Sequence, residues 1–145
     1  MTLTRVHVWR LLVSLLAAVS FVACGGAPAA QHTTADVIAA FKAAGLEAES
    51  PKKMTKEDYG LAPMVATDAT RFLIPSLGAD AGGRVFTFAK KEDLDKTKEY
   101  YDSLGKASAI LFSWTFTHEL ILVQINGTLP EDKAKQYQAA LDGMK

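Results

Sequence analysis

Cysteine is almost absent from this chain of 145 residues, and its scarcity excludes several kinds of protein. The single cysteine, Cys24, has no partner in the chain, so a small domain held together by disulfide bonds is excluded. A zinc or iron–sulfur site built from several thiolates is excluded for the same reason.

An excess of positive charge is missing as well. The chain holds 16 basic and 16 acidic residues, and its formal net charge at pH 7 is zero. Nucleic-acid binding requires clustered positive charge, and anionic lipid surfaces attract polybasic segments. The composition therefore argues against a nucleic-acid partner and against a purely electrostatic contact with membranes.

Long hydrophobic runs are limited to one near the start of the chain. Residues 11–23 form an uncharged, largely apolar run that follows a short segment carrying Arg5 and Arg10. As a helix this run would span about 20 Å, well short of the roughly 30 Å hydrocarbon core of a bilayer. A positive segment followed by a short apolar run is typical of a signal peptide.

The run ends in Phe21-Val22-Ala23-Cys24-Gly25, which resembles the lipobox of bacterial lipoproteins. In that family the cysteine thiol receives a diacylglyceryl group, a dedicated signal peptidase cuts before the cysteine, and the new amino group can be acylated. Phe21 departs from the family pattern, which usually has Leu there. The resemblance implies a lipid on Cys24, and Gly25 in place of Asp implies no mark for retention in an inner membrane.

Two alternatives to a lipoprotein stay open, an ordinary secretory leader with an incidental cysteine and an uncleaved N-terminal anchor. Cleavage before Cys24 would remove residues 1–23 and leave 14 of the basic residues against 16 acidic ones, a net charge of −2. Residues 24–32 are small and uncharged, which predicts a flexible tether to a single domain at residues 33–145. The expected location is a cell membrane or outer membrane, with the domain on the extracytoplasmic side.

The pattern of residues 33–145 predicts an α+β domain. Apolar residues recur at helical spacing in three segments, which are expected to be helices at residues 33–44, 90–104 and 128–144. Short apolar or alternating segments predict strands at residues 71–75, 84–88, 110–117 and 120–126, with a weak strand near 46–49. Helices alternating with hairpins indicate a mainly antiparallel sheet of about four to five strands, with about three helices packed on one face.

Three stretches of the domain, at residues 71–76, 82–86 and 123–125, resemble those of small uncharacterised bacterial lipoproteins. This resemblance implies no particular activity. Gly105 is expected to end the second helix, and Thr128 is expected to cap the third.

Two loops, Pro51–Thr70 and Ser76–Gly83, are the expected contact regions, because long ordered loops are often functional. Gly82-Gly83-Arg84 is expected to form a flexible hairpin end. The alternative is that its backbone amides bind an anion. The possible contact residues in and beside these loops are Tyr59, Met64, Gly82, Gly83 and Arg84.

No catalytic motif emerges from the chain. His118-Glu119 could begin acid–base or metal chemistry, but a hairpin tip is preferred, since His32 is the only other histidine left after cleavage and is expected to be solvated in the tether. Trp114 is expected to lie in the core. The alternative is that it lies on an open face of the sheet and forms the floor of a binding site. No serine lies in a nucleophile elbow. The sequence therefore predicts no catalytic residue, no metal site and no cofactor.

The preferred hypothesis is a non-enzymatic, lipid-anchored binding or interaction module of the bacterial cell envelope. Its expected partners are the membrane, through Cys24, and an unidentified envelope protein or small ligand. The alternative is an envelope hydrolase that uses dispersed carboxylates. The acidic residues of the second helix are expected to form a solvated face and not such a catalytic site. They are Glu92, Asp93, Asp95 and Glu99.

Overall fold

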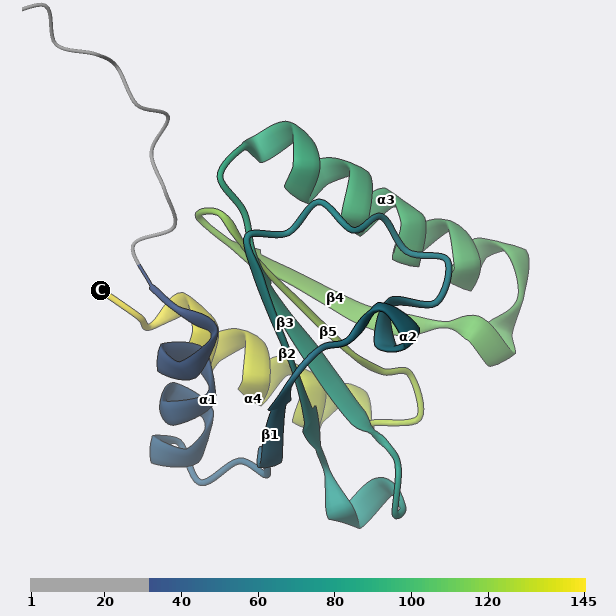
Figure 1. The fold of residues 1–145 in the computed structure, drawn as a ribbon. Coiled ribbons are helices and arrows are strands. Elements are labelled where there is room, and N and C mark those ends of the chain that lie inside the picture. Colours follow the sequence, from purple (N-terminus) through teal and green to yellow (C-terminus); the bar gives the residue numbers. More distant parts are fainter. Residues whose placement is uncertain (1–31) are drawn as a thin grey trace, which may run out of the picture.

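One five-stranded sheet organises the part of the chain that the structure, a computed structural model, describes, which is residues 32–145 (Figure 1). The strands lie in the order β1-β2-β3-β5-β4, and every neighbouring pair is antiparallel. The predicted α+β class and antiparallel sheet are thus confirmed. Along the chain the elements are α1 (Thr34–Ala43), β1 (Glu49–Lys53), α2 (Lys56–Tyr59), β2 (Asp68–Leu73), the 3-10 turn η1 (Pro75–Leu77), β3 (Gly82–Thr87), α3 (Lys91–Ala107), the 3-10 turn η2 (Ala109–Leu111), β4 (Ser113–His118), β5 (Ile121–Asn126) and α4 (Glu131–Asp142).

The predicted signal peptide, Cys24 and all of the predicted tether except His32 lie outside the described residues. Within residues 32–145, no helix is both long and apolar enough to cross a membrane.

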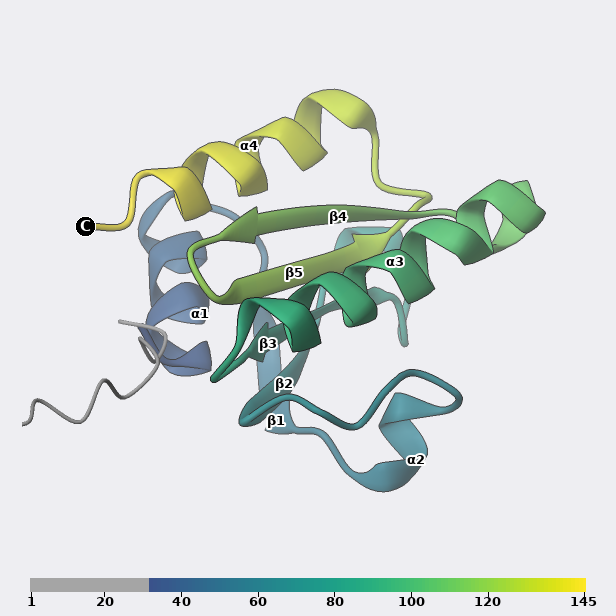
Figure 2. The ribbon, with the colours of Figure 1, turned by 90° about the horizontal axis from the view of Figure 1, so that it is seen from above.

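Helices cover both faces of the sheet (Figures 1 and 2). Val85 and Phe86 are neighbours in β3, so their side chains point to opposite faces and join different clusters of buried residues. α1 and α4 pack on the face of Val85, whereas α3 packs on the face of Phe86. The expectation of three helices on one face is therefore wrong for α3. Residues 121–125 of β5 are all buried, which is typical of a strand covered on both sides.

The first core joins α1 and α4 to the sheet. The Phe41 ring of α1 lies 5.0 Å from the Tyr137 ring of α4 and 5.8 Å from the Phe72 ring of β2, measured between centroids. Thr33 and Asp36 form a reciprocal capping box at the start of α1. This core fixes the two helices against the same side of the sheet.

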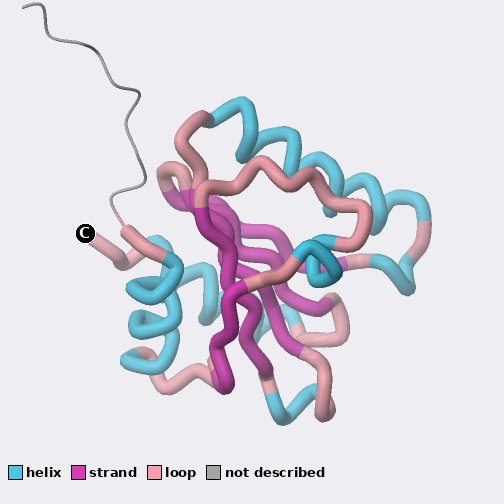
Figure 3. Tube along the Cα trace, in the orientation of Figure 1, coloured by secondary structure: helices cyan, strands magenta, loops and turns pink. Residues whose placement is uncertain are grey.

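The second core is smaller and leaves part of its face of the sheet open. Leu94 and Tyr101 of α3 pack on Phe86 of β3 and Leu122 of β5. The loop at residues 60–67, drawn in pink between α2 and β2 in Figure 3, lies beside α3 and adds two alanines to the same cluster. The open part of this face lies between α2 and the C-terminal half of α3.

The stretch Pro51–Thr70 is not one continuous loop. It contains most of β1, the short helix α2 and the start of β2. All five side chains of β1 are exposed and one belongs to Pro51, so the strand has no apolar alternation from which it could be predicted. Proline is tolerated there because β1 is the edge strand of the sheet.

The predicted strand at residues 110–117 begins too early. Ile110 lies in the turn η2, and β4 starts at Ser113. Gly105 does not end α3, which continues to Ala107. A Cβ on Gly105 would lie 3.2 Å from Cδ2 of Phe112, so this glycine makes room for the chain that returns from η2.

Two smaller expectations also differ from the structure. Gly82 and Gly83 belong to β3 and not to a flexible hairpin end. Thr128 does not cap α4, whose N-cap residue is Pro130. The Thr128 backbone N–H and hydroxyl instead donate to Oδ1 of Asn126, at 2.9 and 2.8 Å, and this closes the turn after β5.

Candidate functional site

A groove of about 480 Å³ occupies the open part of the sheet between α2 and α3. Its floor comes from β2, β3 and β5, and its walls come from α2, the C-terminal half of α3 and the turn η2. Clefts of this size are typical of small-molecule sites. The lining side chains on which the argument below depends are Asp58, Tyr59, Leu61, Arg71, Arg84, Tyr101, Ile110, Leu111, Ser113 and Gln124.

A row of polar residues crosses the sheet beneath this groove. In the strand register Lys52 pairs with Arg71, Arg71 with Arg84, Arg84 with Gln124, and Gln124 with Thr115. Like charges directly opposite each other on neighbouring strands destabilise a sheet. The three neighbouring cations of this row therefore lower the stability of the sheet. Apolar residues at the same positions would not repel one another.

The two arginines of the row have different partners. The guanidinium of Arg71 forms an ion pair with Asp58 at 3.2 Å. Arg84 donates to Oε1 of Gln124 at 2.8 Å and has no carboxylate partner among residues 32–145. A guanidinium carries five N–H donors, so most of the donors of Arg84 are available to a ligand.

Ser113 also lines the groove, and its hydroxyl is unsatisfied. Its hydroxyl oxygen is enclosed and has no hydrogen-bond partner among the described residues. Buried polar groups are nearly always hydrogen-bonded, to protein, water or ligand. Arg84, rather than the enclosed Ser113 hydroxyl, therefore gives the groove a polar floor that can bind an acceptor-rich group.

The rim of the groove is apolar and exposed. Leu61 is 90% exposed, Ile110 is 93% exposed and Leu111 is 51% exposed. Phe112, which follows η2, is 40% exposed and packs edge-on against Trp114, with ring centroids 5.0 Å apart. Exposed apolar side chains gathered around a polar cleft are typical of a binding site.

Three titratable groups of the groove, Asp58, Tyr59 and Tyr101, have shifted pKa values. The Thr55 backbone N–H that donates to the Asp58 carboxylate lowers the pKa of Asp58, and Arg71 lowers it further. Burial raises the pKa of the Tyr59 and Tyr101 hydroxyls. Asp58 therefore stays ionised and both tyrosines stay protonated near neutral pH, so these shifts do not provide a group for proton transfer there.

The structure brings together four of the five residues predicted as contacts. Tyr59, Gly82, Gly83 and Arg84 line the groove, whereas Met64 is exposed and lies outside its lining. Sequence reasoning missed Arg71, Gln124 and Ile110. The first two can be found only from the strand register, and the pattern of residues 110–117 predicts a strand at Ile110.

The two glycines that β3 contributes to the groove, Gly82 and Gly83, serve packing and do not form a flexible anion cradle. Gly83 lies between Phe72 of β2 and Ile125 of β5 in the sheet. A Cβ on Gly83 would lie 2.6 Å from Cζ of Phe72 and 2.7 Å from the backbone oxygen of Gln124. The position therefore requires glycine because the Phe72 ring and the neighbouring strand approach so closely.

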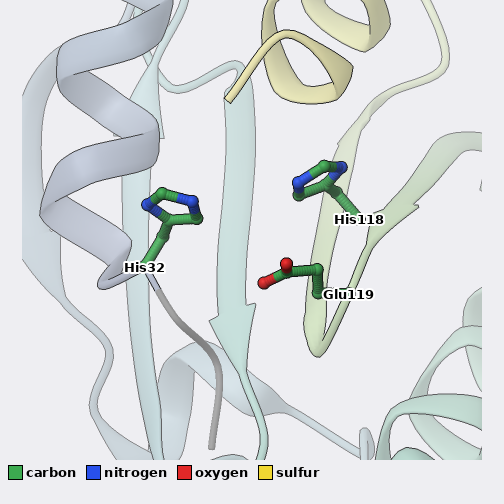
Figure 4. A group of neighbouring side chains, drawn as sticks. All are labelled: His32, His118 and Glu119. Carbon is green, nitrogen blue, oxygen red and sulfur yellow. The ribbon is translucent and has the colours of Figure 1, made fainter. Parts of the chain in front are cut away.

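A second group of polar residues lies on the opposite side of the sheet from the groove. His32, His118 and Glu119 each offer one potential ligand atom, and the three atoms lie within 4.8 Å of one another (Figure 4). His32 was expected to be solvated, but its Nε2 atom is enclosed. Within residues 32–145 these are the side chains that could hold a metal ion.

The remaining candidates do not form a site. Trp114 packs partly buried against the first core, and its indole N–H donates to the Leu129 carbonyl at 2.9 Å, as expected for a core residue. In α3, Glu92 and Asp95 pair with lysines one turn away on an exposed face. A second cavity of about 490 Å³ lies between η1 and the start of α4, but the Tyr137 hydroxyl in its wall already donates to the protein backbone.

Comparison with protein families, with curated proteins and with solved structures gave no match to this chain.

Proposed function

We propose that this chain is a lipid-anchored binding module on the extracytoplasmic face of a bacterial membrane, with the groove between α2 and α3 as its binding site. The anchor half of the proposal rests on the lipobox-like residues that end in Cys24. The binding half rests on one observation, the guanidinium of Arg84 on the groove floor without a carboxylate partner among the described residues.

The ligand that fits this groove is a small organic anion with an apolar body. Charge-assisted hydrogen bonds from a guanidinium to a carboxylate or phosphate are about twice as strong as neutral ones. The apolar body would cover Leu61 and Ile110, which are otherwise almost fully exposed. The concave shape favours a small molecule over a protein partner.

The alternative of an envelope hydrolase has less support. A carboxylate that acts as a general acid needs a raised pKa, and the pKa of Asp58 is lowered. Glu57, the other acid of α2, also has a lowered pKa, because it accepts hydrogen bonds from backbone and from Thr55. Both carboxylates are better suited to holding cations in place than to delivering protons.

Binding can be tested with three probes that share a ten-carbon chain, namely decanoate, decyl phosphate and decanol. Calorimetry on residues 31–145 should show that an anionic probe binds about tenfold more tightly than decanol, the gain expected from one charged hydrogen bond. Arg84→Met should abolish that preference. Lys135→Met is the matched control, since it removes one positive charge from an exposed ion pair on α4. Equal binding of anions and decanol to the wild type would refute the groove assignment.

The anchor requires a separate test. Cells that express the full chain are grown with a radiolabelled fatty acid, and the label on the wild type is compared with that on Cys24→Ala. The proposal predicts label on the wild type alone. Equal labelling of both would refute the anchor and leave the groove assignment untouched.

A further inference from the structure

The cluster of His32, His118 and Glu119 joins two distant parts of the chain. His32 immediately precedes the capping residue of α1, and His118 is the last residue of β4. Glu119 is the first residue of the two-residue connection to β5. Figure 4 shows the two imidazole rings on either side of a gap, with the Glu119 carboxylate directed toward the same gap.

The spacing of these side chains suits a metal ion. The ring centroids of His32 and His118 lie 6.4 Å apart, and one ligand atom from each of the three residues lies within 4.8 Å of the others. Around a tetrahedral zinc ion with bonds of about 2.0–2.1 Å, the ligand atoms lie about 3.4 Å apart. Binding of an ion would therefore draw the ligand atoms closer together, by up to about 1.4 Å.

One feature of the cluster remains unexplained without a ligand. The His32 Nε2 atom is enclosed and has no hydrogen-bond partner among the described residues, which is rare for a buried polar atom. The φ of Glu119 is +50°, as the first position of a two-residue hairpin turn requires, and in this turn its carboxylate faces the two histidines.

We propose that His32, His118 and Glu119 bind one divalent transition-metal ion of the zinc type, with water at the fourth position. Imidazole nitrogen with one carboxylate is a donor set suited to zinc, whereas magnesium and calcium prefer oxygen ligands throughout. The ion would hold the N-terminal end of the domain against the β4–β5 hairpin. This inference does not depend on the groove or on the lipid anchor.

The test uses the full chain in a mild nonionic detergent, freed of metal with a chelator and titrated with zinc chloride in a calorimeter. The wild type should bind one zinc ion per chain and should unfold at a higher temperature when zinc is present. His32→Ala and His118→Ala should each weaken binding by roughly tenfold or more. Glu99→Gln, on the exposed face of α3, is the control for loss of a carboxylate and should bind like the wild type.

Glu119→Gly separates metal binding from folding. Glycine relieves the positive φ, so the metal-free variant should unfold at a higher temperature than the metal-free wild type. The same variant should bind zinc more weakly, because it lacks the carboxylate. The proposal is overturned if the wild type shows no one-to-one binding, or if the His32, His118 and Glu119 variants all bind zinc as the wild type does.

Discussion

The Tyr137 hydroxyl of α4 donates a hydrogen bond of 2.6 Å to the backbone carbonyl of Glu47, in the segment between α1 and β1. The bond links the last helix of the domain to a connection near its start. Burial raises the pKa of Tyr137 to about 12, with a further contribution from the Glu47 carboxylate. The hydroxyl is therefore neutral at physiological pH and can act as a donor throughout that range.

Tyr137→Phe should lower the free energy of unfolding by about 1–1.5 kcal/mol, because it removes one hydrogen bond and leaves a partly buried carbonyl without its donor. Urea unfolding monitored by circular dichroism would measure the change. Tyr100→Phe is the matched control, since no hydrogen bond of the Tyr100 hydroxyl is found among the described residues. A loss of the same size in both variants would show that the bond to Glu47 does not stabilise the domain.

Stability at alkaline pH should depend on the same tyrosine. The pKa of Tyr137 is raised from 10.0 to about 12 on folding, so its contribution is complete below about pH 10 and is lost as the pH rises toward 12. Tyr59 and Tyr101 shift in the same direction, and they should add to the loss. Unfolding free energies measured across this range should fall less steeply for Tyr137→Phe than for the wild type; identical slopes would contradict the assignment.

The fold class and the three longer helices could be predicted because each depends on a local pattern. The capping box at Thr33 and the buried stripe of α4 are visible as residue spacing. The side of the sheet on which α3 packs is not local, because it depends on which face of β3 and β5 remains uncovered. The meeting of His32 with His118 could not be predicted either, since it follows from the path of the whole sheet.

Gly83→Ala should destabilise the domain by about 1–3 kcal/mol, as overpacking usually does. The new Cβ would lie 2.6 Å from the Phe72 ring and 2.7 Å from the backbone of Gln124, and a backbone neighbour cannot move cheaply. In Gly143→Ala the new Cβ would lie 3.3 Å from the Ala139 carbonyl, at the end of α4, and the change should stay within about 0.5 kcal/mol. Thermal unfolding of the two variants compares them directly, and equal midpoints would be inconsistent with close packing at Gly83.

Acid should weaken the contact between α3 and β4. Burial alone would raise the pKa of Asp102, but hydrogen bonds from Lys98 at 2.6 Å and Thr115 at 2.7 Å outweigh it, so the pKa lies below 3.8. A lowered folded-state pKa stabilises the protein above the unfolded-state value, and this contribution is lost as the pH falls through the folded-state value. Asp102→Asn should therefore be less stable than the wild type at neutral pH. The difference between their free energies of unfolding should become smaller below about pH 3.8. Urea unfolding at several pH values would measure this difference. A difference that does not change with pH would contradict a stabilising role for the ionised Asp102 carboxylate.

The apolar rim offers a way to separate binding from folding. Ile110 is 93% exposed and makes little contribution to either core, so Ile110→Asn should change the free energy of unfolding by no more than about 0.5 kcal/mol. If the ligand body covers this side chain, the same change should weaken binding of decanoate by roughly three- to tenfold, the effect of losing part of a buried aliphatic contact. Val65→Asn provides the control, since Val65 is 39% exposed and lies outside the groove lining. Decanoate affinity that is unchanged in Ile110→Asn but reduced in Arg84→Met would place the anion on the floor and the apolar body away from η2.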